Sequence, residues 1–138
     1  MIIGIFGSSK ENRIKLLKQL HKNCRDNSIM VNFYKQSASL LDEEKVFKKI
    51  LEMKFDGPFF LEEFVEGKQL LTIIKNKKNV IFISSILSRD ILDLCSEFYV
   101  GKTNKSSDLY SLYFGNVNPS ENEFIHFKMD TTKESVFI

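Results

Sequence analysis

Short apolar runs alternate with amphipathic segments along most of the chain. The apolar runs are rich in β-branched and aromatic residues, which predicts strands, whereas the amphipathic segments repeat apolar residues at helical spacing. The predicted strands are 2–6, 29–34, 59–61 and 80–86. The predicted helices are 12–23, 68–78 and 88–95, together with a helix that is capped by Ser39 and ends at Met53. The run 80–86 is apolar almost throughout, as is typical of a parallel strand covered on both faces.

The C-terminal part of the chain has a less regular pattern. It predicts a short strand at 98–100, a short helix at 107–114, a hairpin of strands 124–129 and 135–138, and loops at 101–107 and 115–123. Because strands and helices alternate before that part, the predicted fold class is α/β. We expect a single three-layer domain over residues 1–138, with a mostly parallel sheet and helices on both faces.

Composition narrows the class of protein. Of the 138 residues, 43% are hydrophobic and 28% are charged, as in soluble globular domains. The net charge of +2 does not by itself indicate nucleic-acid binding. The apolar start of the chain is too short for a signal peptide or a membrane span, so a cytoplasmic protein without a membrane partner is expected. The richness in Lys, Asn and Ile is compatible with an AT-rich genome, including a viral one.

The lysine cluster and the two cysteines are predicted to have structural roles rather than to bind a ligand. Lysines at positions 75, 77 and 78 are typical of a solvated helix end. Cys24 and Cys95 lie in helical patterns with apolar neighbours, and no Cys/His spacing typical of a metal site accompanies them. The pattern predicts two buried or half-buried thiols in a reducing compartment.

The segment between the first strand and the first helix carries the candidate chemistry. A phosphate-binding loop needs small residues whose backbone N–H groups surround the anion, a lysine for the outer phosphates, a hydroxyl for Mg²⁺ and a helix N-terminus behind it. The segment Gly7 to Ile14 has the position and length of such a loop, and Gly7 takes the place of its leading glycine. A second register, Gly4 to Glu11, puts Lys10 in the lysine place but shortens the first strand.

The later positions of this loop depart from the usual residues. Asn12 stands where the second glycine is expected, and asparagine tolerates the left-handed backbone conformation. Arg13 takes the lysine place, although its planar fork fits a tight loop less well. Ile14 takes the place of the hydroxyl and cannot bind a metal. The segment is also compatible with a tight strand-to-helix turn that binds nothing.

On these residues the chain resembles the P-loop NTPases, with a degenerate loop. Its order of strand, acidic pair, helix, strand, polar tip and helix is similar to that of viral and phage DNA-packaging and DNA-translocating ATPases. The resemblance implies ATP or GTP with Mg²⁺ as ligand, a link to DNA handling, and weak or absent hydrolysis because position 14 lacks a hydroxyl. It implies a cofactor-binding role for Gly7, Ser8, Ser9, Lys10, Asn12 and Arg13.

The resemblance also implies roles for residues at two later strand ends. Glu62 would hold the metal, Glu63 would orient the attacking water, and Ser84 or Ser85 would be a polar sensor. Glu62 and Glu63 also fit an ordinary exposed helix start, which is the commoner explanation for such a pair.

Three other functions fit the same residues. A non-enzymatic interaction module, such as a viral inhibitor or an assembly subunit with a protein partner, would keep the fold and lose the site. A small nucleotide kinase is suggested because the closing segment 124–138 is similar to that of adenylylsulfate-type kinases, although an arginine-rich lid is missing. The opening Ile3 to Ser9, followed by Leu16 and Leu17, resembles flavodoxin-like flavin reductases, in which serines and backbone N–H groups hold the phosphate of FMN without a metal.

Overall fold

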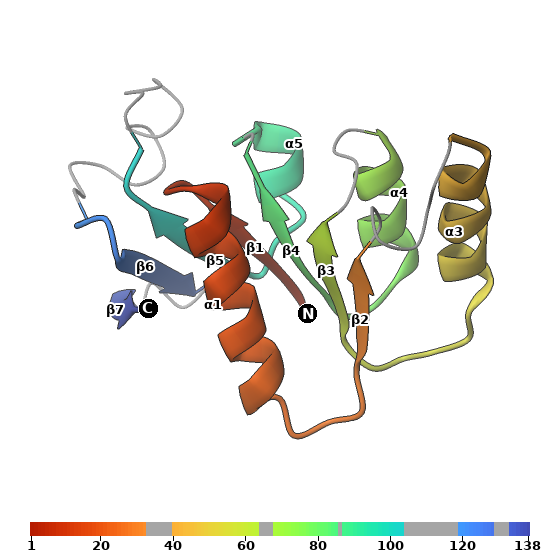
Figure 1. Cartoon of the computed structure of the whole chain (residues 1–138), viewed down its shortest axis with the longest axis horizontal. Helices are drawn as coiled ribbons and strands as arrows, with labels where there is room; N and C mark the ends of the chain where they lie inside the picture. Colours follow the sequence, from red (N-terminus) through yellow and green to blue (C-terminus); the bar gives the residue numbers. More distant parts are fainter. Residues whose placement is uncertain (33–39, 64–67, 86, 104–118, 129–132) are drawn as a thin grey trace.

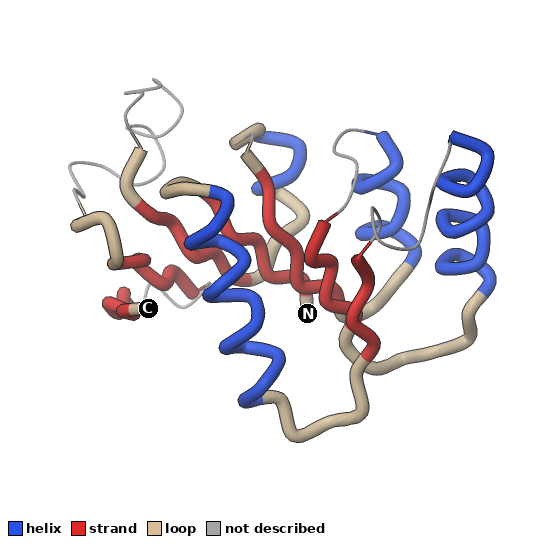
Figure 2. Tube along the Cα trace, viewed as in Figure 1, coloured by secondary structure: helices blue, strands red, loops and turns tan. Residues whose placement is uncertain are grey.

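A single mixed sheet organises the computed structural model, which describes residues 1–32, 40–63, 68–85, 87–103, 119–128 and 133–138. Within those residues the sheet has seven strands in the order β2-β3-β4-β1-β5-β6-β7. Figure 2 draws the strands in red. Strands β1 to β5 are parallel, and β6 and β7 are added as an antiparallel hairpin. The strands are β1 (Ile2–Phe6), β2 (Ile29–Asn32), β3 (Phe59–Glu63), β4 (Val80–Ser84), β5 (Glu97–Gly101), β6 (Glu123–Lys128) and β7 (Lys133–Phe137).

Helices cover both faces of this sheet. Helix α1 lies on one side, and α3, α4 and α5 lie on the other (Figure 1). Their bounds are Lys10–Asn23 for α1, Leu40–Glu52 for α3, Lys68–Asn76 for α4 and Arg89–Leu92 for α5. The predicted α/β class, with a mostly parallel sheet between two helical layers, is confirmed.

Each helical layer has its own apolar core. Because side chains alternate between the two faces of a strand, every central strand contributes to both cores. The core under α1 includes Ile3, Ile5, Leu16, Leu17, Phe60, Ile81, Tyr99 and Phe124. The core under α3, α4 and α5 includes Phe6, Ile50, Phe59, Leu61, Leu70, Ile73, Val80, Phe82, Ile91 and Val100. Strand β4 is buried over nearly its whole length, as the apolar run predicts.

Strand β1 runs through the middle of the sheet, between β4 and β5. The ring of Phe6 folds back over Gly4, where an added Cβ would lie 2.5 Å from the ring. The same ring meets Phe82 edge to face, with centroids 5.9 Å apart. The small residue at position 4 therefore lets Phe6 fill the core directly before the candidate loop.

Several element ends differ from the sequence-based prediction. Helix α1 begins at Lys10, two residues earlier than expected, because the Ser9 hydroxyl accepts the N–H of Asn12 and caps the helix. Strand β4 ends at Ser84 and α5 at Leu92, whereas β2 is described as far as Asn32. The C-terminal hairpin is confirmed as β6 and β7. The predicted helix 107–114, the cap at position 39, the hairpin tip and residues 33, 34 and 86 lie outside the described residues.

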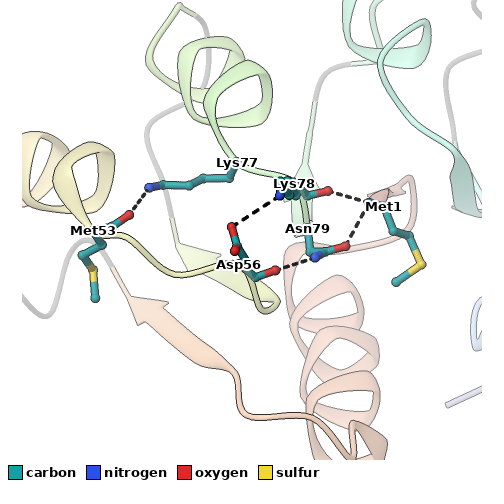
Figure 3. A network of polar contacts seen from close by, with 6 residues as sticks. All are labelled: Met1, Met53, Asp56, Lys77, Lys78 and Asn79. Atoms are coloured by element: carbon teal, nitrogen blue, oxygen red, sulfur yellow. Dashed lines mark hydrogen bonds and ion pairs between the residues drawn. The ribbon is translucent and has the colours of Figure 1, made fainter.

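The lysine cluster after α4 is not a uniformly solvated helix end. Lys77 is only 9% exposed, and its Nζ donates hydrogen bonds to two backbone carbonyls, that of Leu51 at 3.3 Å and that of Met53 at 2.6 Å. Figure 3 shows the bond to Met53. These carbonyls belong to the C-terminal end of α3, where a cation is favourable. The ammonium also lies 5.3 Å from the ring centroid of Phe59. Lys75 and Lys78 are exposed as expected, and the Lys78 Nζ lies 3.8 Å from Asp56 Oδ1. The solvated interpretation was wrong for Lys77 because sequence periodicity cannot reveal carbonyls from another helix.

No helix in the described part of the chain combines the length and the apolar character that a membrane crossing needs.

We expect Lys77→Met to lower the free energy of unfolding by about 1.5–3 kcal/mol, because it keeps the apolar stem but removes a charged donor from two carbonyls. Lys78→Met is the matched control, and loss of its exposed ion pair should cost less than about 1 kcal/mol. Urea denaturation measures both. Equal effects of the two substitutions would contradict the capping role of Lys77.

The two cysteines should differ sharply in reactivity. Burial raises the pKa of the Cys95 thiol to about 12, and its Sγ contacts the Ile91 carbonyl at 3.3 Å, whereas Cys24 is only half-buried. Since the thiolate is the reactive form, a disulfide reagent at pH 8 should label one thiol quickly and the second only after denaturant is added. In Cys24→Ala the fast phase should disappear. A fast phase that persists in this variant would show that Cys95 is accessible.

Candidate functional site

The sheet order gathers the predicted site segments at one edge. The carboxyl ends of parallel strands share an edge, and that edge is the usual ligand side of an open α/β sheet. Ser84 ends β4 and pairs with Phe6, the last residue of β1. Glu62 and Glu63 end β3, which is separated from β1 by β4. At the usual strand spacing this places them about 10 Å from the end of β1.

The turn between β1 and α1 is shorter than the predicted loop. It consists of Gly7, Ser8 and the capping Ser9, so that Asn12, Arg13 and Ile14 lie in the first turns of the helix. This is a difference from the expected eight-residue loop, and it follows from the early cap. The alternative register from Gly4 is excluded, because that glycine lies inside β1.

Two consecutive residues of the turn have left-handed backbones. Gly7 has φ +77° and Ser8 has φ +56°, and Ser8 is the one non-glycine residue with positive φ in the described part of the chain. A Cβ at Gly7 would overlap the carbonyl of Gly101, so the turn touches the end of β5 backbone to backbone. Such strained turns cluster at functional sites, and consecutive N–H groups in them can form an anion-binding concavity.

The donors of this turn are bonded to the connection between β5 and β6. The N–H of Ser8 donates to the carbonyl of Lys102 at 2.6 Å. The Ser8 hydroxyl donates to the carbonyl of Glu121 at 3.2 Å. The Asn12 amide donates both to that carbonyl, at 3.1 Å, and to the Ser8 Oγ, at 3.0 Å. The turn is therefore held from the side of β5.

Arg13 supplies a positive charge beneath the turn. Its side chain is largely buried, and its guanidinium donates to the carbonyls of Gly7 at 3.2 Å and Ser8 at 2.9 Å. The cation thus lies beside the N-terminus of α1, whose dipole adds to the positive potential. Ser9 and Lys10 are exposed at this end of the helix. The combination favours an anion at the mouth of the turn.

Of the two acidic residues at the end of β3, only Glu62 has a described side chain, and it is paired with a lysine. The carboxylate of Glu62 is 11% exposed and lies 3.3 Å from the ammonium of Lys18 on α1. Glu63 pairs with Asn32 through the backbone, and its side chain lies outside the described set. Ser84 is buried, with 1% exposure.

The other described residues do not supply a set of metal ligands around Glu62. No group of three or more His, Cys, Asp or Glu gathers among the described residues. Position 14 offers no oxygen, and the two histidines point elsewhere: His21 packs on Phe60, and His126 bonds Glu97 at 2.9 Å. The residues described do not fit a Mg²⁺ ion held by the protein.

The sequence did not reveal the partners that fix this site. The carbonyls of Lys102 and Glu121 are backbone atoms, so they leave no mark on the residue type, and the Glu121 contacts span 109 and 113 residues. Lys18 is a lysine of α1 with an exposed side chain. Its contact with Glu62 depends on how α1 crosses the sheet, which local periodicity does not determine.

The fold is similar to that of a viral genome-packaging enzyme. No protein-family model matches the chain, and no curated protein matches it in sequence. Among solved structures, the genome packaging NTPase B204 from Sulfolobus turreted icosahedral virus 2 in complex with AMPPCP superposes with a TM-score of 0.66 at 11% identity, covering 97% of this chain and 95% of that chain. The same NTPase in complex with ATP-gammaS gives 0.65 at 11% identity with the same coverage, and in complex with sulfate 0.63 at 12% identity, covering 97% and 94%. At this identity the likeness shows the fold, and the predicted resemblance to DNA-packaging NTPases is confirmed at that level.

Proposed function

We propose that this protein is a nucleotide-binding domain that holds the phosphates of ATP or GTP at the β1–α1 turn, with weak or absent hydrolysis. The observation that carries the proposal is the left-handed pair Gly7 and Ser8, set between the central strand and the N-terminus of α1. Solved structures with this fold are nucleotide complexes of a packaging NTPase, which supports the same ligand class.

The proposed phosphate ligands are the Ser8 N–H and hydroxyl, the first backbone N–H groups of α1 and the cations beside them. A helix N-terminus offers N–H groups without helical acceptors, together with a favourable dipole. Arg13 adds a fixed positive charge, and the exposed Lys10 lies at the first helical position. Gly7, Ser8 and Ser9 shape the turn, and an added side chain at Gly7 would collide with β5.

Weak or absent hydrolysis follows from the acidic residues and position 14. Phosphoryl transfer depends on a metal ion that bridges the outer phosphates and on a residue that orients water. Ile14 has no metal-binding atom, and Glu62 is paired with Lys18. Any Mg²⁺ would therefore arrive with the nucleotide. Glu63 and Ser84 are the remaining candidates for positioning water, and a role in viral DNA handling is part of the same proposal.

A non-enzymatic interaction module is the second candidate. The observation that favours it is that Ser8 and Asn12 already donate to carbonyls of the same chain. A turn whose donors have internal acceptors is stable without a ligand. In that case the fold would serve a protein partner, and the turn would only connect β1 to α1.

Calorimetry of the purified, metal-free protein with ATP, GTP and FMN, repeated with Mg²⁺, distinguishes these functions. We expect ATP or GTP to bind with little dependence on Mg²⁺. Arg13→Ala should weaken that binding about 10- to 100-fold, the range expected for a lost charged hydrogen bond. Arg25→Ala, an exposed arginine beyond the end of α1, is the matched control. Binding of FMN alone would move the protein to the flavin class, and binding of none would leave the interaction module.

We expect phosphate release from ATP to stay close to the uncatalysed rate with or without Mg²⁺, because no group of three metal-binding side chains gathers among the described residues. A coupled phosphate assay measures it. If turnover is found and Glu63→Gln abolishes it, the site is an active NTPase and this part of the proposal is wrong.

A further inference from the structure

The β1–α1 turn and the β5–β6 connection are joined by a compact set of hydrogen bonds. The Ser8 N–H bonds the Lys102 carbonyl. The Ser8 hydroxyl and the Asn12 amide converge on one acceptor, the carbonyl of Glu121. All these donors lie within the first residues after β1, where the proposed phosphate site is.

The Glu121 carbonyl is held in place by a turn of its own. The N–H of Glu123 donates to the carbonyl of Ser120 at 3.1 Å, and the N–H of Ser120 donates to the Glu123 Oε1 at 3.1 Å. The N–H of Ile138 donates to the carbonyl of Asn122 at 3.0 Å. The acceptor is therefore presented to Asn12 by a folded element, the turn 120–123, that leads directly into β6.

We propose that the turn 120–123 is an autoinhibitory element of the nucleotide site, and that Asn12 is the positioning residue that holds it there. The inference rests on the proposed function. A carbonyl oxygen and a phosphate oxygen compete for the same N–H or O–H donor. Phosphate entering the turn must displace the carbonyls of Lys102 and Glu121 from Ser8, so nucleotide binding and docking of the turn 120–123 oppose each other.

This arrangement reverses the role expected for Asn12 from the sequence. As a phosphate-loop residue, Asn12 would support binding, and its removal would weaken the complex. As the residue that holds the turn 120–123 on Ser8, Asn12 stabilises the docked position of that turn. Its removal should therefore strengthen nucleotide binding. Because coupling between two sites is reciprocal, ATP should in turn loosen the turn 120–123.

The experiment compares Asn12→Ala with wild type, using Asn23→Ala as the matched control. Asn23 is an exposed asparagine at the other end of α1. Alanine favours a helix, so both variants should fold, which circular dichroism checks. We expect Asn12→Ala to bind ATP about 2- to 10-fold more tightly, the range given by losing one competing hydrogen bond, and Asn23→Ala to bind like wild type.

Amide hydrogen exchange without nucleotide provides the second measurement. Asn12→Ala should speed the exchange of Ser8 and of the amides at 120–124, and Asn23→Ala should not. Saturating ATP should have the same effect on the amides at 120–124 in the wild-type protein. Unchanged exchange in Asn12→Ala would show that this residue does not hold the turn 120–123.

The outcomes separate this inference from the proposed function. If wild type binds ATP and Asn12→Ala binds equally or less tightly, the autoinhibitory contact is wrong and the nucleotide site stands. If neither protein binds ATP, both proposals fail. If only Asn12→Ala binds, both are supported.

Discussion

The backbone contact between Gly7 and Gly101 determines how the chain leaves the sheet after β1. Neither residue has a side chain, so the turn can lie against the end of β5. Because the two backbones lie so close, the Ser8 N–H can donate a hydrogen bond to the Lys102 carbonyl. Ser8 has a left-handed backbone in this arrangement. The turn then has room for one more residue, the cap Ser9, before α1 begins. The position of the helix N-terminus, and hence of the candidate phosphate site, follows from that contact.

The path of α1 explains why the acidic end of β3 differs from a metal site. Leu16 and Leu17 bury the helix against the sheet, and the residue that follows them, Lys18, reaches Glu62. An ammonium beside a carboxylate with little exposure provides the positive charge that a divalent ion would otherwise supply. The isoleucine at position 14 agrees with this, since a hydroxyl there would have no metal to bind. Lys18 and Ile14 therefore both support the proposal that the protein itself holds no metal ion at this edge.

The sequence predicted the layers of the fold well and the contacts of the site poorly, for separate reasons. Burial on both faces leaves a clear apolar run, so β4 and the alternation around it were found. The length of the β1–α1 turn was overestimated because the capping serine was assigned to a phosphate loop. The environment of Lys77 was misjudged because its partners are carbonyls at the end of α3. Carbonyl acceptors carry no sequence signal, which also hid the contacts of Ser8 and Asn12.

This fold can persist without the usual phosphate-loop residues because its stability and any ligand chemistry depend on different atoms. The sheet and its two cores rest on apolar burial that the turn does not supply. Left alone, a turn that directs N–H groups toward an absent phosphate would hold unsatisfied donors, which is costly wherever water is excluded. Here the Lys102 carbonyl accepts the Ser8 N–H, the Glu121 carbonyl accepts the Ser8 hydroxyl and the Asn12 amide, and the Arg13 guanidinium donates to the carbonyls of Gly7 and Ser8. The turn is thus stabilised by bonds within its own chain, with which, on the inference above, a ligand would compete.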